Sequence, residues 1–166
     1  TAAAARVLAE GKPDDELLGA RAAYAARTGD KALMREAYQA LVALPLAAPD
    51  ARIELLGQMA ELIGAKGEAI DWYGKVPRGD QYIDSQLRIA VLLDDKGDTA
   101  GARDRIRALR AEGIEDDAQL VDTYLLEAEL ASKRGRQEDA VDVLRRGLEV
   151  LPDDQRLLYA RALVYE

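Results

Sequence analysis

Four pairs of adjacent aspartates are the residues of this sequence whose spacing could serve metal binding or catalysis. Two neighbouring carboxylates can bind a divalent cation or work as an acid–base pair. The doublets are Asp14-Asp15, Asp94-Asp95, Asp116-Asp117 and Asp153-Asp154. All but Asp94-Asp95 stand just before a predicted helix, where a carboxylate accepts hydrogen bonds from free amides and meets the positive end of the helix dipole. We therefore interpret these doublets as helix caps, not as metal ligands or catalytic residues.

The absence of two residue types excludes further kinds of catalytic and metal site. The 166 residues include no Cys and no His, which excludes thiolate nucleophiles, imidazole bases, disulfides and the usual zinc and haem ligands. The stretch Gly64-Ala65-Lys66-Gly67 lacks the strand, the glycine spacing and the Lys-Ser/Thr ending of a phosphate-binding loop. The sequence thus predicts no catalytic residue, no cofactor and no metal site, and we expect the chain not to be an enzyme.

Charge and hydropathy bound the possible partners. The formal net charge of -8, with a pI near 4.7, argues against non-specific binding of nucleic acid. No apolar run approaches the ~20 residues that span a bilayer, so no membrane span is expected. The chain begins at Thr1 without Met, and we expect it to be an internal fragment of a longer protein. The compartment stays open, because a chain without Cys suits cytosol and periplasm equally.

Helices are the elements that must position any functional residue. The hydrophobic fraction is 49%, yet there is no Phe and only one Trp, and Ala, Leu, Arg and Glu recur throughout. This composition favours closely packed helices, and the alternating Val, Ile or Thr runs of strands are absent. We therefore predict an all-α chain of about ten helices, including helices at 1–10, 15–27, 31–44 and 83–96.

The most regular stretch runs from Val121 to Asp154, VDTYLLEAELASKRGRQEDAVDVLRRGLEVLPDD. It contains two amphipathic segments joined at Gly135, and Pro152 ends the second. Small residues on the facing stripes allow close packing, and a large residue on each segment fills the space beside them. The stripes are Tyr124, Ala128 and Ala131 on the first segment and Ala140, Leu144 and Gly147 on the second.

This order of an aromatic, a small residue, an Ala, a bulky residue and a Pro resembles the 34-residue tetratricopeptide repeat (TPR). Glu127 departs from the pattern, because the family usually has Leu there. The stretches AIDWYGKVP and QLRIAVLLDDKG also look like large bacterial multi-repeat TPR proteins. The resemblance implies a right-handed α-solenoid of antiparallel helix pairs, in which each pair stabilises its neighbours.

We divide this single predicted solenoid by its helix pairs. The divisions are 1–49 with irregular helices and a truncated start, repeats at 50–82, 83–120 and 121–154, and a truncated first helix at 155–166. The turn glycines Gly64, Gly97 and Gly135 lie 33 and 38 residues apart, so we expect about four extra residues in the connection 112–119. In the last helix, Leu158, Ala162 and Tyr165 have the offsets of an inward stripe that nothing yet covers.

The TPR resemblance implies that the first helices line a concave surface that binds peptides. The family's groove positions correspond here to Glu54, Leu55, Gln58, Glu61, Asp84, Leu87, Arg88, Val91, Asp94, Asp122, Leu125, Leu126, Glu129 and Ser132. This set is acidic with apolar patches, so we predict a groove for a basic or amphipathic segment of a protein partner. The alternative, that these side chains are only solvated or serve helix starts, remains open.

At the level of function, the sequence predicts a non-catalytic scaffold or adaptor. The alternative is a regulatory or self-assembly segment of a larger protein, with possible self-association through the uncovered last helix. Trp72 has two interpretations as well, a binding hot spot or a packing residue between repeats, and we favour packing.

Overall fold

The computed structural model describes residues 20–21, 24–25, 27–44 and 52–164, and all regular structure within them is helical. Eight helices have defined bounds, and no strand occurs in these ranges. They are α3 (Lys31–Val42), α4 (Arg52–Leu62), α5 (Lys66–Tyr73), α6 (Tyr82–Asp95), α7 (Thr99–Ala111), α8 (Asp117–Lys133), α9 (Gln137–Val150) and α10 (Gln155–Val164). The helix predicted at 1–10 lies outside the described residues. Of the one predicted at 15–27, the described residues 20, 21, 24, 25 and 27 are helical.

The chain divides into two compact units, Thr1–Lys75 and Val76–Glu166. In the first unit Asp30 caps α3, because its carboxylate accepts a hydrogen bond from the Leu33 amide at 3.0 Å. Helices α4 and α5 pack along each other as a pair. They lie close together at Gly57, where a Cβ would be 2.8 Å from the ring of Tyr73. Glycine is therefore the residue that lets this ring lie against α4.

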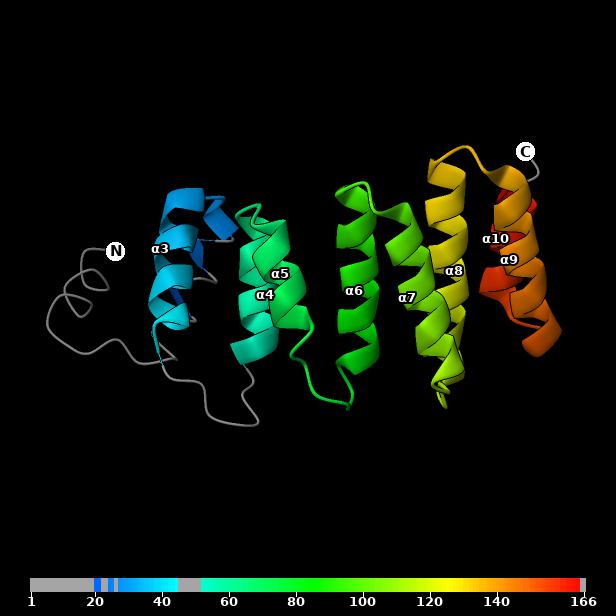
Figure 1. Ribbon diagram of the computed structural model, residues 1–166, viewed down its shortest axis with the longest axis horizontal. Coiled ribbons are helices and arrows are strands. Elements are labelled where there is room, and N and C mark those ends of the chain that lie inside the picture. The colour runs from blue at the N-terminus through cyan, green and yellow to red at the C-terminus, as the bar shows by residue number, and fades with distance from the viewer. Residues whose placement is uncertain (1–19, 22–23, 26, 45–51, 165–166) are drawn as a thin grey trace, which may run out of the picture. The chain divides into compact units, whose positions relative to one another are not determined.

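In the second unit, α6 to α10 form an up-and-down series (Figure 1). The α6–α7 and α8–α9 turns lie at one end of the helices, and the α7–α8 connection lies at the other. Gly97 (φ 92°) and Gly135 (φ 71°) occupy the left-handed region in the first two turns, a conformation that glycine adopts without steric cost. Asp98 then caps α7 by accepting from the Gly101 amide at 2.9 Å. The predicted turns at Gly97 and Gly135 are confirmed here.

The long spacing between Gly97 and Gly135 has a different origin from the predicted one. The extra residues do not lengthen the loop, because the connection covers only 112–116. They lengthen both helices of this interval, because α7 has 13 residues against 8 in α5, and α8 has 17 against 14 in α6. Asp116 caps this longer helix by accepting from the Gln119 amide at 2.8 Å. The prediction of a longer connection is therefore wrong, and the helix begins four residues before Val121.

The core of the second unit contains the predicted Ala128, Ala131, Ala140 and Leu144 together with apolar residues that the predicted stripes did not include. One cluster joins α8, α9 and α10 through Val121, Ala128, Ala131, Ala140, Val143, Leu144 and Leu157, and another joins α6, α7 and α8 through Ala90, Ala102, Ile106 and Leu130. Gly147 is buried as predicted, and a Cβ there would lie 3.0 Å from Cγ of Tyr124. Close packing of small residues against a large side chain thus holds the α8–α9 pair together.

The last helix, α10, buries a different residue from the one predicted. Leu157 is fully buried, whereas Leu158 is 40% exposed. The inward stripe is therefore shifted by one residue from the prediction, in which Leu158 and Ala162 faced inward; Ala162 is exposed, and Tyr165 lies outside the described residues. Tyr159 and Leu163, at 67% and 51% exposure, are among the exposed large apolar side chains of this helix.

Candidate protein-binding site

The acidic doublets within the described residues are structural. Asp116 caps α8, and Asp154 caps α10 by accepting from the Leu157 amide at 3.0 Å. Asp14-Asp15 lies outside the described residues. Within the described part of the chain, no group of three or more acidic side chains is placed to hold a metal ion. Nor is any helix described there both long and apolar enough to cross a membrane.

The predicted groove residues of the second unit lie on α6 and α8, two helices that pack against each other. Asp84, Arg88 and Glu129 are exposed. The apolar members are half-buried: Leu87 and Leu126 pack on the core cluster of α6, α7 and α8, and Leu125 packs on that of α8, α9 and α10. The two helices therefore present partly exposed apolar side chains next to charged ones.

Asp122 lies on the same face of α8 as Leu125 and Glu129, but its carboxylate forms an ion pair within the chain. Arg156 of α10 donates to its carboxylate at 2.7 Å and also donates to the Ala118 carbonyl at 3.0 Å. Ser132 lies at the other end of α8; it is half-buried, and its Oγ is a buried atom without a hydrogen-bond partner. The ion pair of Asp122 lowers the net negative charge that this face offers to a partner.

Asp94 differs from the other predicted groove residues, because its side chain is fully buried. Its carboxylate accepts a hydrogen bond from Thr99 at 2.9 Å and pairs with Arg134 at 3.1 Å and with Lys133 at 3.7 Å. Burial alone would raise the pKa of this carboxyl, but the hydrogen bonds from Arg134 and Thr99 and the nearby positive charges outweigh it, so the pKa is lowered. Asp94 ties the end of α6 to the end of α8 and is not placed to touch a partner.

In the first unit, the predicted residues Glu54, Leu55, Gln58 and Glu61 lie on α4. Gln58 donates to Glu54 at 2.9 Å, and the Tyr73 hydroxyl donates to Glu61 at 3.2 Å. Burial, together with the charge of Glu54, raises the pKa of Tyr73 to about 12, so the phenol stays protonated and remains a donor at neutral pH. Glu54, Gln58 and Glu61 thus form a polar row along α4.

Trp72 is half-buried and interacts with its own unit. Its indole N–H donates to the Tyr38 hydroxyl at 2.9 Å, and Tyr38 in turn donates to Glu68 at 2.5 Å. Lys75 lies over the Trp72 ring, 3.8 Å from the centroid. These contacts join α3 to α5, which agrees with the packing interpretation of Trp72.

Glu127 is a buried charged residue whose role the sequence did not reveal. Its side chain is only 4% exposed, and its two carboxylate oxygens accept hydrogen bonds from Arg107, at 2.7 Å, and from Arg110. Arg110 also lies over the ring of Tyr124, 4.4 Å from the centroid. The available signal was the pair of arginines three residues apart on the preceding helix, at the position where a carboxylate replaces the usual Leu.

Comparison with known proteins agrees with the helix pairing. No family model matches the chain. A TPR repeat-containing protein of Pseudomonas aeruginosa is 34% identical over 111 residues, which cover 67% of this chain and 18% of the relative. The chain belongs to the tetratricopeptide repeat family. Its TPR resemblance and the expectation of an all-α helical-repeat fold are thus confirmed. This TPR chain spans less than a fifth of the length of the relative it matches.

Proposed function

We propose that this TPR chain is a non-catalytic interaction scaffold whose helices α6 and α8, in the second unit, bind a basic or amphipathic segment of a partner protein. The observation that carries the proposal is the joint surface of α6 and α8. There the exposed carboxylates of Asp84 and Glu129 accompany the half-buried side chains of Leu87, Val91 and Leu126. TPR proteins as a family bind other proteins, which supports the proposed role as an interaction scaffold.

The two kinds of side chain have different roles in the proposal. The apolar groups gain from burial against a partner, and this gain is independent of charge. The carboxylates attract a basic segment and favour it over an acidic one, an effect that salt screens. A helical partner with Lys or Arg beside Leu or Ile would match both.

The proposal is tested with an array of labelled peptides that vary in charge and amphipathicity, measured by fluorescence anisotropy. Glu129→Lys and Asp84→Lys reverse the charge on α8 and on α6 and should weaken binding of basic peptides by about an order of magnitude at low salt, less at high salt. Glu115→Lys makes the same charge change in the connection before α8 and should bind like the wild type. Equal affinity of the wild type and all variants would contradict peptide binding in the predicted groove.

A second candidate is self-assembly within a larger protein. The observation in its favour is the apolar surface of α10, where Tyr159 and Leu163 are more than half exposed. Sizing chromatography over a concentration series separates the two functions, because a peptide-binding groove predicts no change of mass with concentration. Self-assembly predicts oligomers that disappear when Leu163 is changed to Glu.

A further inference from the structure

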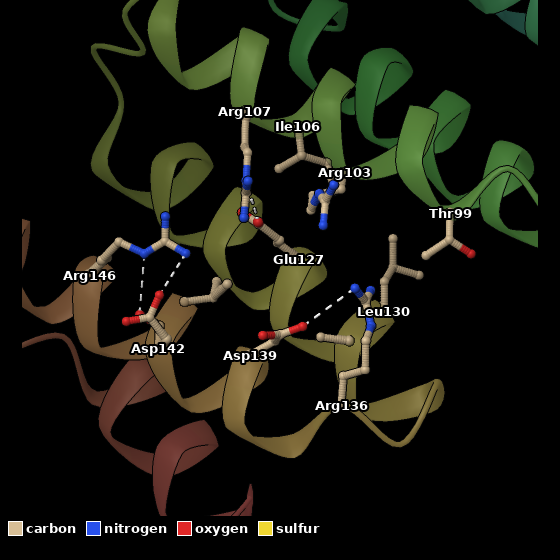
Figure 2. Close-up of a pocket in the computed structure, with 12 residues that line it drawn as sticks. Thr99, Arg103, Ile106, Arg107, Glu127, Leu130, Arg136, Asp139, Asp142 and Arg146 are labelled. Carbon is tan, nitrogen blue, oxygen red and sulfur yellow. Dashed lines mark hydrogen bonds and ion pairs between the residues drawn. The ribbon is translucent and has the colours of Figure 1, made fainter.

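A pocket of about 120 Å³ lies between α7, α8 and α9, and four arginines line it (Figure 2). Arg103 and Arg107 come from α7, Arg136 is the residue that precedes α9, and Arg146 comes from α9 itself. Glu127 of α8 lies among them. The same space would admit several water molecules or one phosphate-sized group.

The pocket lies on the other side of α8 from the predicted groove. At 100° per residue, Glu127, Leu130 and Ala131 cluster on one face of α8, and these three residues line the pocket. Leu125 and Glu129, which belong to the predicted groove, lie on the opposite face of the helix. Occupation of the pocket and of the groove can therefore be tested independently.

Each carboxylate that lines the pocket already has a guanidinium partner. Both oxygens of Glu127 are taken by Arg107 and Arg110. Asp142 pairs with Arg146 at 3.0 Å and with Arg145 at 2.6 Å. Asp139 pairs with Arg136 at a longer distance, 3.4 Å. These pairs leave Arg103 as the positive charge of the pocket that no lining carboxylate neutralises.

Arg103 lacks an acceptor for a buried donor. Its Nε is buried without a hydrogen-bond partner, and its ion pair with Asp104 is 3.7 Å long. The side chain of Asp104 is 70% exposed, so water screens that pair. In Figure 2 the guanidinium of Arg103 points between Glu127 and Leu130, and no dashed line joins it to another residue drawn. A buried N–H without an acceptor is unfavourable, and a bound acceptor would remove the cost.

From this geometry we infer that the pocket is a binding site for an oxyanion, a phosphate or a carboxylate group, held by Arg103 with Arg136 and Arg107. The planar guanidinium matches the oxygens of such groups and can donate two parallel hydrogen bonds. The group comes either from a free anion or from an acidic or phosphorylated side chain of a partner. Asp139, whose pair with Arg136 is already long, is the lining carboxylate that yields its guanidinium to the ligand.

The test uses inorganic phosphate as the probe and the whole chain as the protein. Thermal midpoints are measured in increasing potassium phosphate and in potassium chloride of equal ionic strength and pH. Phosphate should raise the wild-type midpoint above the chloride value, as a ligand of the native state does. Arg103→Gln should weaken the apparent phosphate affinity about tenfold or more, since a charged hydrogen bond is lost. Arg78→Gln, which removes an exposed arginine paired with Glu112 outside the pocket, should leave that affinity unchanged.

Circular dichroism shows whether each variant is folded, and Arg136→Gln replaces Arg103→Gln if the latter is not. A midpoint independent of phosphate, or an equal response of wild type and the folded pocket variant, overturns the inference. A labelled hexapeptide with one phosphoserine, with matched Glu and Ala versions, distinguishes the sources of the anion. Binding of the charged versions that phosphate displaces indicates a partner side chain, whereas a response to phosphate alone indicates a free anion. Neither result depends on the basic peptides that test the groove.

Discussion

Glu127 occupies a position where the TPR family usually has Leu, and it is buried against the two arginines that α7 supplies. A carboxylate loses its hydration on burial, and only close, hydrogen-bonded partners compensate for that loss. Arg110 is itself only 12% exposed, so each of these two residues depends on the other. Burial of Glu127 and Arg110 is therefore tolerated when both are present, whereas burial of either charge without the other is unfavourable.

We predict that Glu127→Leu lowers the free energy of unfolding by about 3–5 kcal/mol, because it leaves Arg110 buried without its carboxylate. The double variant Glu127→Leu/Arg110→Leu should recover most of that loss, since well-packed apolar residues often replace a buried ion pair without cost. Urea unfolding measures both. Arg78→Gln, in an exposed pair, should change stability by no more than about 1 kcal/mol. Equal stabilities of the single variant and the wild type would mean that the pair contributes nothing.

Between elements, the α4–α5 pair depends on the absence of a side chain at Gly57. A Cβ added there would lie 2.8 Å from two ring atoms of Tyr73, whose hydroxyl is hydrogen-bonded to Glu61. Real Cβ atoms do not come so close, so the ring would have to move away from its partner. The contact sets how near the two helices approach.

Gly57→Ala tests this contact against helix propensity. Alanine in a helix interior gains about 1 kcal/mol over glycine, whereas overpacking costs about 1–3 kcal/mol, so we expect a net loss of up to about 2 kcal/mol in urea unfolding. Gly67→Ala, at an exposed position of α5 in the same unit, should be neutral or stabilising. A stabilised Gly57→Ala variant would show that Tyr73 can shift without cost.

The sequence predicts where helices lie better than it predicts which side chains meet between them. Helix α6 was predicted at 83–96 and is found at Tyr82–Asp95, because the turn glycine and the capping Asp98 mark its end. The predicted connection at 112–119 placed the start of α8 too late, since residues 117–120 show no apolar stripe, although the Asp116-Asp117 doublet was correctly assigned to a helix start. The partners of Asp94 and Glu127 could not be predicted, because periodicity places a side chain on a face but does not identify what packs against it. Whether the predicted groove binds a partner is still to be tested.

At the scale of the whole molecule, both core clusters of α6 to α10 lie within the second unit, Val76–Glu166. Stability of repeat proteins is approximately a sum of repeats and their nearest-neighbour interfaces, so a subset of repeats can fold. Every buried residue that the structure describes in these two clusters belongs to α6, α7, α8, α9 or α10.

We therefore predict that a fragment of residues 76–166 folds by itself. Circular dichroism should show a helical spectrum and a cooperative melt, with a lower midpoint than the whole chain because fewer interfaces remain. Ala128→Glu in the same fragment places a charge in a position that is 4% exposed and should abolish the cooperative melt. A fragment that is unfolded under native conditions would show that the second unit depends on the first.

The ion pairs between successive helix pairs restrict the order in which these repeats can occur. Glu127 needs the arginines of the repeat before it, and Asp94 needs Arg134 and Lys133 of the repeat after it. Repeats with identical interfaces can be exchanged for one another. Exchanging the α6–α7 repeat with the α8–α9 repeat, however, would leave the buried carboxylates of Glu127 and Asp94 without their arginine and lysine partners. We therefore expect an array in which these two repeats are separated to be less stable than the native order, even if each repeat is intact.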